Sequence, residues 1–273
     1  MKDDTIDDFV TYRIEDEIAI IGINRPAKRN AISDRIVEAI HAAVLRAGAE
    51  AKAAVIHGHG PHFCAGLDLS EHSEKSLIEA VKGSRRWHAV FDEIERGSIP
   101  FVSALTGATV GGGFELAAST HVRVTDTTAF FALPEGQRGI FVGGGGSVRI
   151  SRLIGPARMG DMMLTGRVLD AEAMERWGGV TYVEAEGKAL ERAISVAHRM
   201  AENAEFTNYA IINALPRISD MSADNGLFTE SMVSALATLT DDAKDRLRAF
   251  LEKRAAKVVA PGGTYEIFAR RRS

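Results

Sequence analysis

Residues 100–116 read PFVSALTGATVGGGFEL, a stretch in which a short apolar run leads into a glycine run and then into a helical pattern. The apolar residues 100–105 are typical of a buried strand, and the pattern after the glycines predicts a helix that begins at about Gly112. A strand that passes through a glycine turn into a helix is a local unit of α/β proteins. The first amides of such a helix have no partners within it, so this turn favours binding of a negative oxygen.

The same alternation of strand and helix patterns extends through the first two-thirds of the chain and predicts an α/β fold. Ser33 can cap a helix with one apolar face, and a second helix is predicted at about 78–94. From about Glu191 onward the patterns predict only amphipathic helices. We therefore expect a core over 1–190 and a helical region over 191–273 that packs on the core or on another subunit. The predicted strands are 9–15, 18–23, 53–57, 101–105, 121–125 and 129–132, and the later helices are 189–202, 205–215, 227–239 and 241–257.

The composition of the chain excludes several classes of protein. Its 273 residues are 45% hydrophobic, which suits a globular protein with a large core. A net charge of −4 provides no positive field for phosphates, so we expect no nucleic-acid binding. Cys64 is the only cysteine, and residues 1–4 lack the pattern of a signal peptide, which together predict a cytoplasmic location. No apolar run approaches the roughly 20 residues of a membrane helix, so we expect no membrane association.

Neither cofactor motifs nor metal-binding patterns stand out in the sequence. It lacks Gly-x-x-x-x-Gly-Lys-Ser/Thr, and Gly-x-Gly-x-x-Gly is absent from the strand-to-helix turns, so we expect no nucleotide cofactor. His57, His59 and His62 are close in sequence, but strand alternation and an intervening Gly-Pro disfavour their convergence on a metal. We interpret Cys64 as a small buried residue, because no base partner is evident. Trp87, with an aromatic residue one helical turn later, is interpreted as core or pocket wall.

Two further glycine segments adjoin predicted strands. They are residues 57–69, HGHGPHFCAGLDL, and residues 139–146, GIFVGGGG. Loops at strand ends gather functional groups in α/β proteins, and glycine lets a ligand approach the backbone closely. These segments are therefore candidate walls of the same site as the turn before residue 112.

Two glutamates are the candidate acid and base groups. Glu115 follows Gly112 by one helical turn, which brings its carboxylate to the face where the free amides lie. Glu135 follows the apolar residues 130–134, and partial burial there would raise its pKa into a useful range. Amides for an oxyanion beside an acid/base group suit enolate or tetrahedral chemistry at a thioester carbonyl. Two glutamates in one pocket can serve as the acid and the base of a water addition.

The chain resembles the enoyl-CoA hydratase/isomerase (crotonase) family in four motifs, whose order and spacing match across nearly the whole chain. The motifs are 24–31 (NRPAKRNA), 63–69 (FCAGLDL), 111–117 (GGGFELA) and 134–139 (PE, then glycine at 139). The resemblance implies a crotonase-like spiral of ββα units with a helical C-terminal region that assembles trimers or dimers of trimers. It also implies an acyl-CoA thioester as substrate, with coenzyme A as part of that substrate and no separate cofactor.

The resemblance further implies an enoyl-CoA hydratase and assigns roles to residues. The amides of Leu67 and Gly112 would form the oxyanion hole. Glu115 would orient and deprotonate the water, and Glu135 would deliver a proton to Cα. The residues implied for binding the substrate and coenzyme A are Lys28, near the phosphates or adenine, Ala65, Gly66 and Asp68.

Departures from the family pattern leave alternatives open. Val142 stands where many relatives have a proline, and Phe114 stands where many hydratases carry a smaller residue. Both substitutions could reshape the acyl pocket, so the acyl preference is undetermined. A Δ3,Δ2-enoyl-CoA isomerase would need only Glu135, and hydrolase or lyase variants are further alternatives. A protein that merely binds CoA thioesters is disfavoured, because two buried carboxylates cost solvation energy without a benefit to binding.

Overall fold

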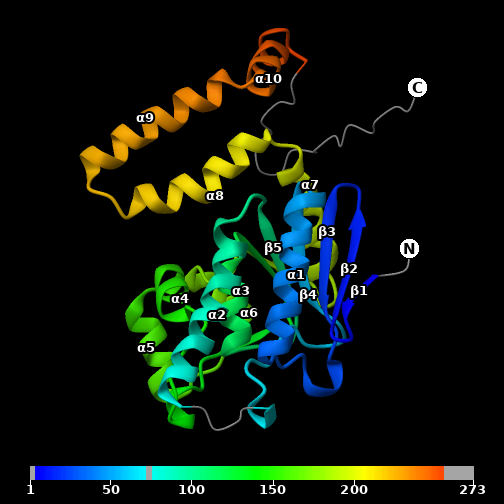
Figure 1. Ribbon diagram of the computed structural model, residues 1–273, viewed down its shortest axis with the longest axis vertical. Helices are drawn as coiled ribbons and strands as arrows, with labels where there is room; N and C mark the ends of the chain where they lie inside the picture. Colours follow the sequence, from blue (N-terminus) through cyan, green and yellow to red (C-terminus); the bar gives the residue numbers. More distant parts are fainter. Residues whose placement is uncertain (1–3, 72–75, 255–273) are drawn as a thin grey trace. The chain divides into compact units, whose positions relative to one another are not determined.

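The computed structural model describes residues 4–71 and 76–254 and places a seven-stranded sheet at the centre of the fold (Figure 1). The strand order is β1-β2-β3-β4-β5-β7-β10. The first three strands pair antiparallel, and the remaining neighbours are parallel. The strands are β1 (Asp4–Asp7), β2 (Val10–Glu15), β3 (Ile18–Ile23), β4 (Ala53–Gly58), β5 (Phe101–Leu105), β7 (Val122–Asp126) and β10 (Tyr182–Glu184).

Helices cover both faces of this sheet, which explains why its central strands are mostly apolar. Ile18 and Ile20 of β3 point to one face, where they pack with α7. Ile21 and Ile23 point to the other face, where the larger core includes α1, α2 and α3. The helices of this unit are α1 (Asp34–Glu50), α2 (Leu77–Arg96), α3 (Gly112–Ser119), α4 (Gly146–Ile154), α5 (Pro156–Thr165), α6 (Ala171–Trp177), α7 (Ala189–Ala201) and α8 (Glu205–Ser219).

A second, three-stranded sheet lies next to the glycine turn that precedes α3. Its strands are β6 (Ala108–Val110), β8 (Phe130–Ala132) and β9 (Leu169–Asp170), in the order β6-β8-β9. The parallel pairing of β6 with β8 aligns Val110 with Ala132. This register brings the chain before Gly111 beside the chain before Glu135, so the small sheet joins two of the glycine-bearing segments.

The contacts divide the chain into two units. The first ends at Met221, and the second begins at Ser222 and contains α9 (Ala223–Leu239) and α10 (Asp241–Leu251). The expected boundary after residue 190 falls within the first unit, just after the start of α7, which packs on β5 and β4. An assembly role for residues 191–273 stays a prediction.

The α/β fold expected from the sequence is confirmed, with each of the six predicted strands matched by a strand of the structure. The predicted helix at 241–257 ends as α10 at Leu251, and its last residues, 255–257, lie outside the described residues. The sequence patterns do not predict the helices α4, α5 and α6. Within the described residues, no helix combines the length and apolar character needed to cross a membrane.

Candidate active site

The site is built around the first turn of α3. Gly111 has φ +53°, a conformation that favours glycine, and directs the chain from β6 into the helix. Gly113 lies directly against the backbone of Cys64, since a Cβ atom there would be 2.8 Å from the Cys64 Cβ atom. All eight residues of α3 are buried. The helix start is therefore fixed in the core beside residues 64–67.

Two backbone amides meet beside this helix start. A Cβ atom on Gly112 would lie 3.6 Å from the Leu67 nitrogen, which places the two residues in contact. Ile32 bonds to the neighbours of Leu67, donating to Gly66 O at 2.8 Å and accepting from Asp68 N at 2.8 Å. No described residue accepts a hydrogen bond from the amide of Leu67 or of Gly112. Two adjacent donors are thus available to a ligand oxygen.

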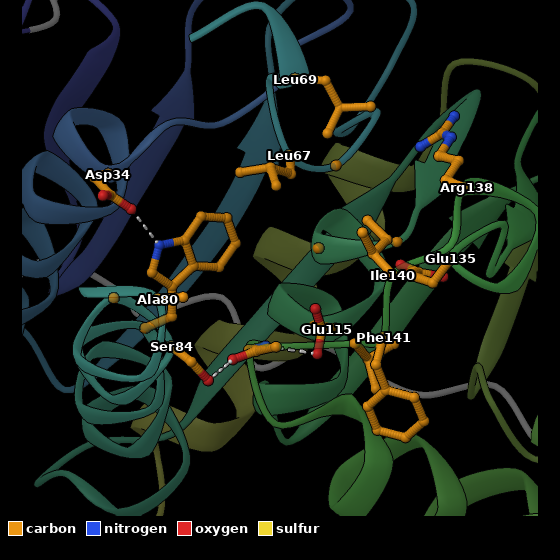
Figure 2. A pocket seen from close by; sticks show the side chains of 18 of the residues that line it. Asp34, Leu67, Leu69, Ala80, Ser84, Glu115, Glu135, Arg138, Ile140 and Phe141 are labelled. Atoms are coloured by element: carbon orange, nitrogen blue, oxygen red, sulfur yellow. Dashed lines mark hydrogen bonds between the residues drawn. The ribbon is translucent and has the colours of Figure 1, made fainter. Parts of the chain in front are cut away.

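Glu115 is held from one side by the third glycine segment. Its Oε1 atom accepts hydrogen bonds from Gly144 N and Gly146 N, both at 2.8 Å. Only 3% of Glu115 is exposed, and burial raises the pKa of its carboxyl although the amides of Gly146, Gly144 and Gly143 oppose this shift. The carboxylate is therefore oriented by the main chain while it lines the pocket (Figure 2).

Glu135 occupies the same pocket with fewer partners. It begins the short turn η3 (Gly136–Arg138), and a Cβ atom on Gly111 would lie 2.7 Å from its Oε1 atom. Its Oε2 atom is buried and has no hydrogen-bond partner among the described residues. Burial and the charge of Glu115 raise the pKa of this carboxyl, and Arg138 lowers it to a lesser extent. Glu135 therefore lies against the turn that opens α3.

A pocket of about 280 Å³ joins these groups (Figure 2). Ala80, Gly83, Ser84 and Trp87 of α2 form one wall, at the three-to-four residue spacing of a single helix face. The opposite wall comes from η3 and the residues after it. The lining also includes Asp34, Ala65, Gly66, Leu67, Leu69, Gly111, Gly112, Glu115, Glu135, Arg138, Ile140, Phe141, Val142, Gly143 and Gly144.

A groove of about 410 Å³ adjoins this pocket and shares with it Ala65, Leu67, Leu69 and Arg138. Lys28 and Asp68 line the groove. Gly66 lines only the pocket, so the structure distributes the residues expected to bind coenzyme A over two adjoining spaces.

Lys28 and Asp68 are bonded to each other within the groove. Lys28 Nζ donates to Asp68 Oδ2 at 2.9 Å and to Ser70 Oγ at 2.8 Å. Arg25 donates to the same Asp68 oxygen at 2.7 Å. Burial opposes the charge on Asp68, but hydrogen bonds from Ser70, Lys28 and Arg25 outweigh it and hold the pKa of Asp68 well below its usual range. Asp68 thus fixes the direction of Lys28.

Other residues singled out in the sequence take definite places. Trp87 is a pocket wall: its ring would lie 3.0 Å from a Cβ atom on Gly112, and its indole donates to Asp34 at 2.9 Å. Val142 lines the pocket, whereas Phe114 packs on Phe131 in the core and is not part of the lining. The suggestion that Phe114 shapes the acyl pocket is therefore wrong, because its side chain points away from the pocket into the core. Burial raises the pKa of the Cys64 thiol to about 12, which disfavours a nucleophilic role.

Sequence reasoning missed the roles of Ser84, Arg138 and the glycine amides that hold Glu115. Arg138 lies where the pocket meets the groove, and its guanidinium forms no hydrogen bond or ion pair with a described residue. The glycine run at 143–146 is visible in the sequence. Its hydrogen bonds to Glu115 could not be predicted there, because every residue type except proline has a backbone amide donor.

The chain matches the family model described as enoyl-CoA hydratase/isomerase over residues 13–259. The chain belongs to this family. A Short-chain-enoyl-CoA hydratase of Clostridium acetobutylicum is 30% identical over 88% of this chain and 93% of its own. A 2,3-dehydroadipyl-CoA hydratase of Escherichia coli is 30% identical over 88% of this chain and 94% of its own. The family expected from the four motifs is confirmed.

Solved structures of this family share the fold. A protein of Rhodopseudomonas palustris is 45% identical with a TM-score of 0.88, and the match covers 90% of this chain and 95% of that chain. An enoyl-CoA hydratase of Bacillus anthracis is 26% identical with a TM-score of 0.84, over 90% of this chain and 97% of that chain. The α/β architecture is therefore the crotonase fold, as the sequence predicted.

Proposed function

We propose that this enoyl-CoA hydratase/isomerase family member is a hydratase that adds water to a 2-enoyl-CoA thioester through Glu115 and Glu135. The observation that carries the proposal is the convergence on one pocket of two buried glutamates and of two amides that donate to no described residue. The amides supply donors for a thioester oxygen, and the carboxylates supply a base and an acid. Relatives about 30% identical over most of the chain are named as hydratases, which supports the same activity here.

In the proposed reaction, the oxygen of water bonds to Cβ while Glu115 takes the proton of that water. The electrons of the double bond move onto the thioester oxygen as an enolate, which the amides of Leu67 and Gly112 stabilise. The enolate then collapses as Cα takes a proton from Glu135. Proton exchange with solvent returns Glu115 to its ionised form and Glu135 to its protonated form. One water is added, and no redox partner is required.

The surroundings of the two glutamates support this division of roles. Amides at 2.8 Å favour the ionised form of Glu115, which a base needs. Glu135 has a buried oxygen without a partner among the described residues and lies in the field of the Glu115 charge, and both effects favour its protonated form. Burial raises the pKa of both carboxyls, and the amides that bind Glu115 oppose this rise there, which suits Glu115 to the role of base and Glu135 to the role of acid.

The adjoining groove is the proposed path of coenzyme A. Lys28, fixed by Asp68, would meet the phosphates or the adenine, and Ala65 and Gly66 would line the route to the oxyanion hole. Arg138 adds a cation that pairs with no carboxylate of the described residues, at the point where groove and pocket meet. Paired guanidinium or ammonium groups suit phosphate, and no cofactor beyond the substrate is proposed.

The proposed assembly is a homotrimer or a dimer of trimers, and the proposed location is the cytoplasm. Helix α9 supports assembly, since its apolar residues are not confined to one face and several of them are exposed. Cys64, the only cysteine, is a free thiol, which suits a reducing compartment.

Replacement of the glutamates tests the activity. Glu115→Gln and Glu135→Gln should each lower kcat for hydration by about 10²- to 10⁴-fold, because each removes one proton-transfer step. Loss of the conjugated thioester absorbance of crotonyl-CoA, and of longer and aryl 2-enoyl-CoA esters, measures the rate. Glu172→Gln is the matched control, since Glu172 is exposed on α6.

The same variants distinguish a hydratase from an isomerase. A wild-type protein that leaves every 2-enoyl ester unchanged contradicts the hydratase proposal. If it instead converts 3-enoyl-CoA esters into conjugated products, and Glu115→Gln keeps that rate, the protein is an isomerase that relies on Glu135.

A further inference from the structure

The segment that holds Glu115 cannot fix its own conformation. Gly143 to Gly146 are four consecutive glycines, and glycine loses more backbone freedom on folding than any other residue. Larger residues do not fit: a Cβ atom on Gly144 would lie 2.9 Å from the Phe91 ring, and one on Gly146 would lie 2.8 Å from Glu115 Cγ. Gly145 has φ +100°. The close approach to Glu115 thus requires a segment that needs support from elsewhere.

Two hydrogen bonds to carbonyl oxygens of the glycine run provide that support, one from a side chain of α2 and one from an arginine that α2 holds. Ser84 Oγ donates to Gly143 O at 2.6 Å (Figure 2). Arg149, buried on α4, donates to Gly144 O at 3.1 Å and is itself bonded to Asp92 and Glu95 of α2. Both carbonyls that flank the Gly144 amide are therefore tied to α2, one directly and one through Arg149.

We infer that Ser84 is a positioning residue for Glu115. It fixes Gly143 O, this orients the peptide groups that follow, and the amides of Gly144 and Gly146 then hold the base toward the substrate. A misplacement of about 1 Å in a catalytic group can cost about 100-fold in rate. The inference rests on the proposed function for its kinetic test only. Ser84 is chosen over Arg149, because removal of Arg149 would leave Asp92 and Glu95 without their buried partner.

Ser84→Ala should lower kcat for 2-enoyl-CoA hydration by about tenfold to 100-fold while KM changes little. The acid limb of the pH profile should move to higher pH, because weaker amide bonds raise the pKa of Glu115. The charge of His88 also lowers the pKa of Glu115, and the charge of Glu115 raises the pKa of Glu135. Ser84→Thr, which keeps the hydroxyl, should restore most of the rate. Ser98→Ala is the control, since Ser98 binds Gly48 O at 3.3 Å and does not line the pocket.

Hydrogen exchange provides a readout that does not depend on catalysis. In Ser84→Ala the amides of residues 143–146 should exchange at least about tenfold faster than in the wild type, as local opening becomes easier. Unchanged exchange together with an unchanged pH profile overturns the inference. A rise in KM alone also overturns it, because Ser84 would then act only as a wall that contacts substrate. If the wild type hydrates no ester, the proposed function fails while the exchange result still decides the role of Ser84.

Discussion

Glu115 and Glu135 have the same carboxyl group, but their surroundings give it different properties. Glu115 is buried and bonded by two amides, so its charge is supported. Glu135 is buried, and its Oε2 atom has no partner in the part of the chain that the structure describes, so its neutral form is favoured. At the residue scale the chemistry therefore depends on which backbone groups reach each carboxyl, rather than on the residue type.

The rate should have a bell-shaped dependence on pH. Burial raises the pKa of Glu115, so the base becomes protonated and activity falls on the acid side at a pH above the ordinary value of 4.5. Burial and the charge of Glu115 raise the pKa of Glu135, so loss of its proton defines the alkaline side. The kcat/KM of hydration across the pH range measures both limbs, which belong to the coupled pair. An acid limb at or below pH 4.5 would contradict the assignment of Glu115 as a buried base.

At the scale of elements, the active site depends on how closely α3 approaches the chain at Cys64. The approach places the Gly112 amide beside Leu67, and only glycine at position 113 allows it. A similar demand for space explains the small residues on the pocket face of α2, where Gly83 lies in the middle of a helix of 20 residues. A glycine there costs about 0.5–1 kcal/mol of helix stability relative to alanine, and it leaves room for the acyl group.

Gly113→Ala should lower the free energy of unfolding by about 1–3 kcal/mol, because the new methyl group meets Cβ and Sγ of Cys64 within 3 Å. It should also reduce hydration by moving the Gly112 amide. Gly160→Ala is the matched control on α5, where a Cβ atom meets nothing within 4 Å, and it should raise stability by about 0.5–1 kcal/mol. Thermal unfolding of the three proteins at equal concentration gives the comparison. Equal losses in both variants would show that the contact with Cys64 is not the cause.

At the scale of the whole molecule, the second unit carries apolar side chains that the single chain leaves exposed. Leu227, Phe228, Leu236 and Leu239 of α9 are each more than half exposed. A group of exposed apolar side chains is typical of an interface, and in the described residues this unit offers α10 as the packing partner of α9. The surface is therefore suited to contact with other copies of the chain.

Sedimentation velocity should give a mass of three or six times 29.4 kDa. The double variant Leu236→Asp and Leu239→Asp should shift the population toward monomer, because charges cannot be buried in an apolar contact without a large cost. A matched double substitution of exposed Asp241 and Asp242 by asparagine should leave the mass unchanged. A monomeric wild type would contradict the proposed assembly.

The parts of the fold that could be predicted are those with a strong local sequence pattern. The strand at 18–23 and the helix near 78–94 have strong local patterns, and the structure has them at Ile18–Ile23 and Leu77–Arg96. The strands β6 and β9 have three and two residues, too few to establish a periodicity. Partners elsewhere in the chain complete the hydrogen bonds of β6 and β9, so these two strands could not be predicted from local sequence, whereas β8 of the same sheet was predicted.

The sequence by itself determined the family, the α/β class and the identity of the two glutamates, because residue identities and short-range patterns are written in it directly. Only the tertiary structure decided which groups surround the two glutamates. The amides that bind Glu115 come from residues 29 and 31 positions away, and Lys28 meets Asp68 across 40 positions. Backbone donors have no residue identity, and long-range contacts form only when packing brings distant segments together. The environment that distinguishes the two carboxyls is therefore a property of the fold.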